Sequence, residues 1–202
     1  DSITDLLAEE HDPHLTPFLG IPGKDNGVDI EGVAAHGDRL YLGMRGPVLR
    51  GWAVLLEVRP ITHPRDERRL TLAELPGGGR YRTHFLDLGG LGIRDLCPHG
   101  DDLLLLTGPS MSLSGPIRVE RWRDGCVVDA ADVVRRGELE TLMSLPHGDG
   151  ADHAEGITLL DDDHLLVVYD SPASPRHTEH GILAALQHAG VHAVADTGYQ
   201  GT

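Results

Sequence analysis

The segment HGDGADHAEG at residues 147–156 has the densest set of potential metal ligands in the chain. Its carboxylates belong to Asp149, Asp152 and Glu155, and oxygen ligands of this kind are those that calcium prefers. His153 lies between two of them, and an imidazole can carry a proton near neutral pH. The segment is therefore a candidate calcium site with a proton carrier beside it. The same residue types are also common in turns, so a purely structural interpretation stays open.

A second acidic segment, KDNGVDIEG at residues 24–32, offers Asp25, Asn26, Asp29 and Glu31 as further oxygen ligands. Both segments contain a Glu-Gly pair just before an apolar run. Loops held by rigid strands are where binding sites are usually built. The sequence indicates no cofactor other than calcium.

The composition narrows the classes of partner. The chain has 202 residues and a formal net charge of −15, with 17 basic residues against 32 acidic ones. Nucleic-acid binding relies on a basic surface that releases counterions, so a nucleic-acid partner is not expected. No run approaches the roughly 20 apolar residues of a membrane helix, so no membrane partner is expected either. The remaining partners are a small molecule or another protein.

Cys97 and Cys126 are the only cysteines. Two cysteines are too few for a disulfide framework, and they lack the paired spacing of a zinc site. Cys97 lies in an apolar run, where a free cysteine acts as a small hydrophobic residue. A single bridge between the two stays open, and the cysteine usage favours a reducing cytoplasm.

Short apolar runs set the secondary structure. SITDLLAEE at residues 2–10 has the apolar spacing of one short helix, which ends before Asp12-Pro13. From residue 28 onward, apolar runs such as RLYLGM, WAVLLEV and THFLDL are separated by Gly, Pro and Asp, and the charged stretch ERRL at 67–70 is expected to be a solvated loop. This pattern predicts an all-β fold, as a sandwich, barrel or propeller.

An internal repeat favours the propeller. IEGVAAHGDRLYLGMRGP at 30–47 aligns with IRDLCPHGDDLLLLTGP at 93–109 and AEGITLLDDDHLLVVYDSP at 154–172. Glu31, Arg94 and Glu155 fall at equivalent positions, 63 and 61 residues apart. Such a period is typical of repeat architectures, and each unit has room for the four strands of a propeller blade.

The repeat divides the chain into a leading helix and loop, followed by three blades. Their expected bounds are residues 1–24, 25–88, 89–146 and 147–202. Closed propellers usually have at least four blades, so we expect three blades of a larger ring, whose other blades lie N-terminal to Asp1 or come from a second copy.

The chain also resembles a known family. KDNGVDIEGVAAHGDRLYLGMRGPVLRGWAVLLEV, then FLDLGGLGIRDLCPHGDDLLLLTGP and AEGITLL, resemble the bacterial domain-of-unknown-function (DUF) 3616 family. This resemblance implies a β-propeller of uncharacterised activity. Family members are longer, and this sequence is similar to their C-terminal part. No catalytic residue carries over.

The Glu-Gly pairs are similar, more loosely, to those of calcium-dependent lactonase and phytase-like propellers, where a glutamate points into the central channel and binds metal. That resemblance implies metal-binding roles for Glu31 and Glu155. Arg94 weighs against it, because a fixed positive charge repels a cation.

Three interpretations of Glu31, Arg94 and Glu155 follow. They form an ion-pair cluster lining a channel, hold a cation, or bind an anionic substrate through the arginine. The first and third fit a binding scaffold. The second fits a calcium-assisted hydrolase of lactones or phosphoesters, in which Asp29, Glu31, Asp152 and Glu155 hold the metal.

Overall fold

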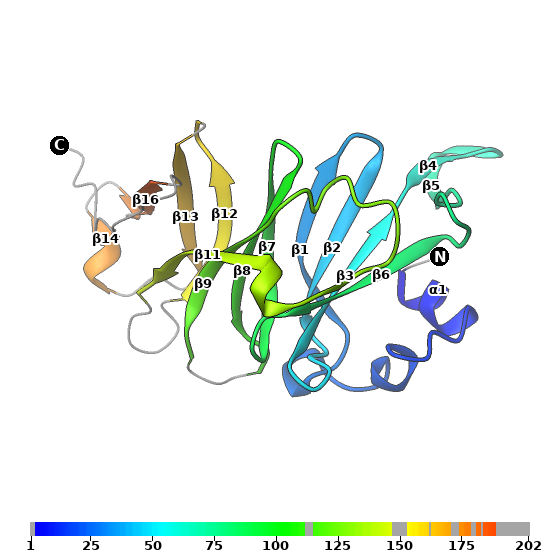
Figure 1. Cartoon of the computed structure of the whole chain (residues 1–202), viewed down its shortest axis with the longest axis horizontal. Coiled ribbons are helices and arrows are strands. Elements are labelled where there is room, and N and C mark those ends of the chain that lie inside the picture. The colour runs from blue at the N-terminus through cyan, green and yellow to red at the C-terminus, as the bar shows by residue number, and fades with distance from the viewer. Residues whose placement is uncertain are drawn as a thin grey trace.

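Three mainly antiparallel sheets stand side by side in the protein (Figure 1). The computed structural model describes residues 3–111, 115–146, 153–161, 163–170, 174–178, 181–182 and 184–188. Strands dominate the described residues, and the one α-helix, α1 (Ile3–Glu9), lies where the sequence predicts it. The all-β class is therefore confirmed. None of the sheets in these ranges closes on itself, and no described helix has the length and apolar character needed to cross a membrane.

Each sheet is a meander in which consecutive strands pair. The first sheet contains β1 (Asp29–His36), β2 (Arg39–Gly46), β3 (Trp52–Val58), β6 (Tyr81–Asp87) and β10 (Val133–Val134). The second contains β7 (Leu91–His99), β8 (Asp102–Pro109), β9 (Ile117–Trp122) and β11 (Leu139–Leu145). The third contains β12 (His153–Leu159), β13 (His164–Asp170) and β16 (Ala185–His188). Strand β10 pairs in parallel with β6, so the segment between β9 and β11 returns to the first sheet.

Shorter elements join these sheets. They are the hairpins β4 (Pro60–His63) with β5 (Asp66–Leu72) and β14 (His177–Thr178) with β15 (Gly181–Ile182), and the 3-10 turns η1 (Thr16–Phe18), η2 (Gly23–Asp25), η3 (Arg136–Glu138) and η4 (Ser174–Arg176).

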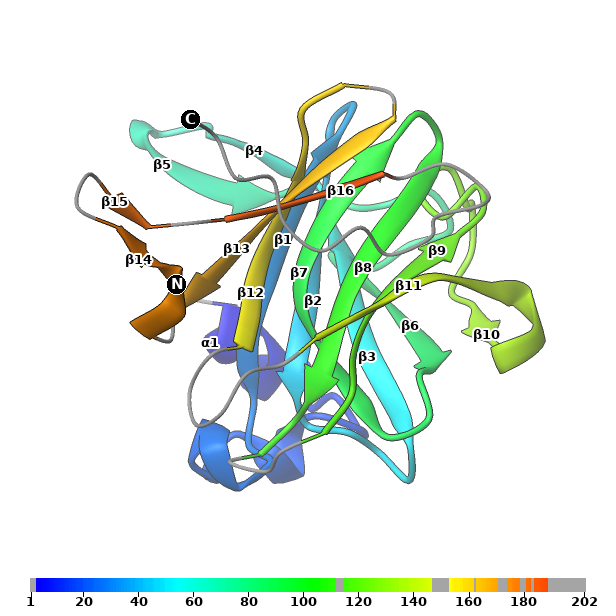
Figure 2. The ribbon, with the colours of Figure 1, turned by 90° about the vertical axis from the view of Figure 1, so that its left-hand side faces the viewer.

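The sheets pack face to face, and their first strands β1, β7 and β12 are neighbours (Figure 2). Tyr41 and Leu55 of the first sheet contact a layer that includes Leu103 and Leu105 of the second. The other face of β8 contributes Leu104 to the layer shared with the third sheet. Strand β8 is thus covered on both faces, which explains why its run LLLL lacks alternation.

The N-terminal segment covers part of the outer face of the first sheet. Leu7 of α1 and Leu15 pack with Met44, Val54 and Leu56 in a third apolar layer. Asp12 fixes the turn after α1 by accepting hydrogen bonds from the backbone N–H groups of His14 (2.8 Å) and Leu15 (2.7 Å). The helix therefore covers the face of β2 and β3 that points away from the second sheet.

One segment differs from its expected form. The sequence predicts a solvated loop around ERRL at residues 67–70, but these residues lie in β5, which pairs with β4 in a projecting hairpin (Figure 1). The strand is exposed along most of its length, so it lacks the apolar alternation by which strands are recognised.

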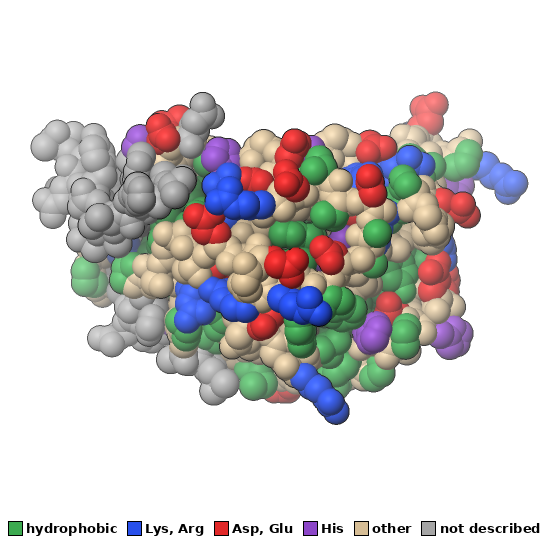
Figure 3. Space-filling model, in the orientation of Figure 1, with side chains coloured by type: hydrophobic (Ala, Val, Ile, Leu, Met, Phe, Trp, Pro, Cys, Tyr) green, Lys and Arg blue, Asp and Glu red, His purple; other side chains and the backbone are tan. Residues whose placement is uncertain are grey.

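Acidic and basic side chains lie interspersed on the face of the protein shown in Figure 3, despite the excess of acidic residues in the chain.

Glycine sets the distance between the first two sheets. A Cβ on Gly32 would lie 3.0 Å from Cα of Asp95 and 3.1 Å from Cγ of Leu96. Gly43 is similar, since its Cβ would lie 2.4 Å from Cγ2 of Ile93. Strands β1 and β2 can therefore approach β7 only because Gly32 and Gly43 lack a side chain.

We predict that Gly32→Ala lowers the free energy of unfolding by about 1–3 kcal/mol, because the added methyl group would be too close to the backbone of Asp95 and the side chain of Leu96. Gly20→Ala is the matched control, since nothing lies within 4 Å of its Cβ position. Urea unfolding of both variants measures the effect. Equal stability of the two variants would contradict the close approach of β1 and β7.

Candidate functional site

The three equivalent positions found in the sequence are three equivalent β-bulges. The pairing of β1 with β2 skips Glu31, that of β7 with β8 skips Arg94, and that of β12 with β13 skips Glu155. A bulge puts an extra residue into one strand and redirects its side chain. The sequence thus repeats a backbone irregularity together with the charged residue that it directs.

The bulges bring their side chains into an alternating row of charges, which we call the charge ladder: Asp29, Arg45, Glu31, Arg94 and Glu155. Asp29 pairs with Nη2 of Arg45, whose Nη1 lies 2.7 Å from Oε1 of Glu31. Nη1 of Arg94 lies 3.9 Å from Oε2 of Glu31 and 2.7 Å from Oε1 of Glu155. The ladder therefore links all three sheets.

The arginines of the ladder lie deeper than the carboxylates. The side chains of Arg45 and Arg94 are 15% and 7% exposed, against 24% for Glu31 and 37% for Glu155. Arg94 also donates to the carbonyl of Pro109 at 3.3 Å. The lack of a side chain at Gly108 gives Arg94 its space, because a Cβ there would lie 2.5 Å from its Nε. The ladder thus presents carboxylate oxygens outward over buried guanidinium groups.

Burial raises the pKa of Glu31 above its ordinary value of 4.5. The charges of Arg45 and Arg94 oppose this shift, while those of Asp29 and Glu155 add to it. Protonation of Glu31 consequently favours the folded state, so its contribution to stability grows as the pH falls.

The remaining candidate residues have varied surroundings. His153 begins β12, where its register partner is Asp170. Asn26 serves a turn, since its Oδ1 accepts from the N–H of Val48 at 2.8 Å. Asp149 and Asp152 lie outside the described residues. Within the described ranges, no three His, Cys, Asp or Glu side chains converge as metal ligands.

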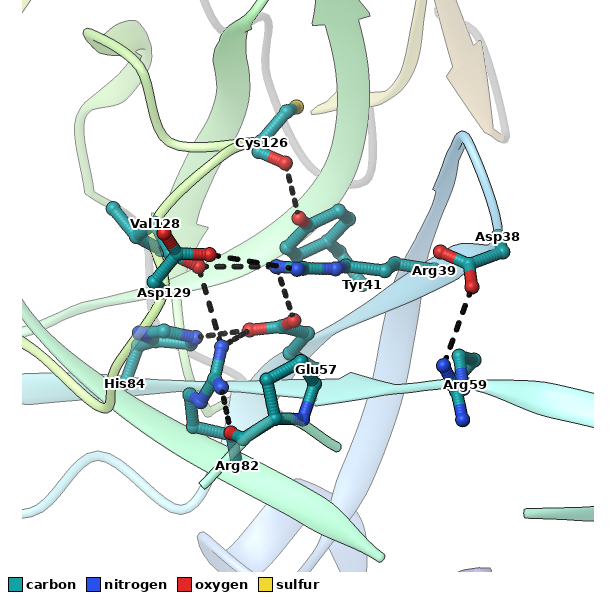
Figure 4. A network of polar contacts seen from close by, with 11 residues as sticks. Asp38, Arg39, Tyr41, Glu57, Arg59, Arg82, His84, Cys126, Val128 and Asp129 are labelled. Carbon is teal, nitrogen blue, oxygen red and sulfur yellow. Dashed lines mark hydrogen bonds and ion pairs between the residues drawn. The ribbon is translucent and has the colours of Figure 1, made fainter. Parts of the chain in front are cut away.

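Sequence reasoning missed Arg45, and it also missed a buried cluster around Glu57 in β3 (Figure 4). The Glu57 side chain is fully buried, and Arg39 and Arg82 each place an Nη1 atom 2.8 Å from one of its oxygens. Nε2 of His84 lies 3.1 Å from Oε2. A carboxylate only accepts hydrogen bonds, so His84 donates from Nε2.

The Glu57 cluster anchors the connection between β9 and β10 to the first sheet. Arg39 and Arg82 both donate to the carbonyl of Val128, at 3.0 and 3.2 Å. Tyr41 donates to the carbonyl of Cys126 at 2.7 Å. Because Glu57 is closed to solvent, its charge is neutralised by these protein side chains and not by solvent ions. Cys126 and Cys97 are both free and buried.

An equivalent buried acid lies in the second sheet. Glu120 of β9 follows Glu57 by the same 63 residues that separate Glu31 from Arg94. Arg136 binds both of its oxygens, at 2.9 and 3.2 Å, and the hydroxyl of Thr141 donates to Oε2 at 2.7 Å. The repeat therefore includes a second charged position, in the third strands of the first and second sheets.

The charges around Glu57 reverse the effect of its burial. Burial alone would raise its pKa, but the hydrogen bond from His84 and the charges of Arg82 and Arg39 hold the pKa below its ordinary value of 4.5. The stability that the ionised group contributes is therefore present above pH 4.5 and is lost as the pH falls through the lower, folded-state pKa.

One protein family matches most of the chain. A profile described as "Protein of unknown function (DUF3616)" matches residues 1–185 of the 202. The chain belongs to this family. No curated protein and no solved structure gives a significant match. The family resemblance of the sequence is thus confirmed, and the DUF3616 match spans the charge ladder and the Glu57 cluster.

Arg94→Gln tests the ladder, because it leaves Glu31 and Glu155 without the charge between them. We predict a loss of about 2 kcal/mol in the free energy of unfolding at neutral pH. The loss should shrink as the pH falls toward 4.5, because protonation of Glu31 then relieves the repulsion. Urea unfolding at several pH values measures it. Arg123→Gln, in the exposed pair with Glu140, is the control. A loss that does not vary with pH would contradict the ladder.

Glu57→Gln tests the buried cluster. The amide nitrogen of glutamine cannot accept from the arginines, so we predict a loss of about 3–5 kcal/mol at pH 7. Glu140→Gln removes an exposed carboxylate from its arginine and should cost less than about 1 kcal/mol. Chemical denaturation followed by tryptophan fluorescence measures both. If both variants lost a similar free energy of unfolding, the buried ion pairs of Glu57 would contribute no more to stability than an ion pair at the surface, which would contradict this account of the cluster.

Proposed function

We propose that this chain is a section of a β-propeller that serves as a binding scaffold for a protein or small-molecule partner, with the charge ladder as an internal fastening. Its blades would be residues 25–88, 89–146 and 147–202. The sheets have the features that blades require. Each is a meander, and their first strands lie next to one another as inner strands would around a channel.

The observation that supports a scaffold most strongly is the pairing of Arg94 with Glu155 and Glu31. These glutamates are the residues on which metal catalysis would depend, yet a buried guanidinium lies between them. A cation at the same place would have to approach that fixed charge. An anionic substrate would in turn have to displace the carboxylates from the arginine.

A second candidate, a calcium-assisted hydrolase of lactones or phosphoesters, is favoured by one observation. The ladder has three carboxylates against two arginines, and its carboxylates are the more exposed members. In that case Asp29, Glu31 and Glu155, with Asp149 and Asp152, would hold the cation, and His153 would carry the proton.

Calcium separates the two functions. A ligand that binds only the folded state at 100 times its Kd stabilises it by about 2.7 kcal/mol, which raises the melting temperature by several degrees. We predict that millimolar calcium shifts the melting temperature by less than about 1 °C. Elemental analysis of the purified protein should accordingly find no stoichiometric divalent metal.

Glu155→Gln provides the matched comparison, with Glu67→Gln in the exposed strand β5 as its control. A calcium-dependent rise of several degrees that Glu155→Gln abolishes and Glu67→Gln retains would contradict the scaffold and favour the hydrolase.

A further inference from the structure

Each of the three sheets has two faces, and the sequence repeat places equivalent residues on the corresponding faces of all three sheets. We call the rear face the one that contains the paired residues Val33 and Leu42 in the first sheet, Leu96 and Leu105 in the second, and Ile157 and Val167 in the third. The front face contains the next pair along each hairpin: Ala34 with Tyr41, Cys97 with Leu104, and Thr158 with Leu166.

Rear faces pack on front faces inside the chain. Leu96 and Leu105 of the second sheet are buried against a layer that contains Ala34 and Tyr41 of the first. The third sheet repeats the arrangement, because Ile157 and Val167 are buried with Cys97 and Leu104. The same positions thus make both contacts between sheets.

The rear face of the first sheet keeps this apolar pattern, and no sheet of the described residues packs against it. Val33, the counterpart of Leu96, is 54% exposed. Helix α1 covers only part of this face, and Leu42, the register partner of Val33, lines a groove of about 260 Å³. Its lining also includes Leu40 and, from the projecting hairpin, Leu70 and Leu72.

The front face of the third sheet is open in the corresponding way. Val168, the counterpart of Leu106, is 46% exposed, although Leu106 is fully buried in the second sheet. Thr158 is exposed and Leu166 is half-buried. The two ends of the stack therefore present the two halves of a contact that the chain makes twice within itself.

We propose that the rear face of the first sheet binds the front face of the third sheet of a second copy of this chain. The contact is head-to-tail, so it uses two different surfaces of each copy. Two copies would supply six sheets, within the four to eight blades of closed propellers. The closure of that ring rests on the proposed propeller arrangement. Calcium takes no part in the contact between the two copies, so the result of the association experiment is independent of the calcium test.

Sedimentation velocity of the full chain, from about 1 to 200 µM, tests the contact, because association depends on concentration. We expect wild type to form a dimer. Val33→Glu blocks one face and Val168→Glu the other, and each variant alone should remain monomeric. Val127→Glu, at an exposed position between β9 and β10, is the control and should associate as wild type. Circular dichroism and thermal melting establish that each variant is folded.

Mixing the two variants identifies a head-to-tail contact. Val33→Glu retains an intact front face and Val168→Glu an intact rear face, so an equimolar mixture should form a dimer with one copy of each. A contact between two identical faces would give no such recovery. The proposal is overturned if wild type stays monomeric, if Val168→Glu associates like wild type, if Val127→Glu also blocks association, or if the mixture stays monomeric.

Discussion

The alternation of charge along adjacent first strands is the constraint on which the arrangement of the three sheets depends. Each first strand carries a bulge at the same position, and the three bulges are neighbours. Three carboxylates placed there would repel one another in a partly buried setting. Arg94 in the middle sheet converts that repulsion into attraction on both sides, and Arg45 extends the alternation to Asp29. Glycine completes the arrangement, because Gly32 and Gly108 leave room for a neighbouring backbone and for Arg94.

Buried acids in the third strands follow the same physical rule. Glu57 and Glu120 are both fully buried, and each is satisfied by arginine. A buried carboxylate without a cation would cost several kcal/mol, so these positions hold their partners firmly in place. In the first sheet the partners Arg39 and Arg82 also bind the segment that leaves β9. Charge pairing therefore fastens the sheets at their first strands and again through the connection that returns to the first sheet.

Much of this organisation could be predicted from the repeat, because its period is a property of the sequence. The equivalence of Glu31, Arg94 and Glu155 was evident, and the same 63-residue spacing would have found Glu57 and Glu120 in the third strands. Arg45 could not be found in this way, because it is an extra residue of β2: Met44 and Gly46 on either side of it correspond to Thr107 and Gly108, which are adjacent in the second repeat. Strand β5 was missed because an exposed, polar strand has no apolar alternation to identify it.

The central claim is that Arg94 and Glu155 stabilise each other and thereby join the second and third sheets. A double-mutant cycle with Arg94→Gln, Glu155→Gln and the combined variant isolates that pairwise energy from other effects of each substitution. The free energies of unfolding are measured with urea at pH 7 in the presence of EDTA. We predict a favourable coupling energy of about 1 kcal/mol or more. Additive losses, with a coupling energy near zero, would contradict the claim and leave Glu155 available for another partner.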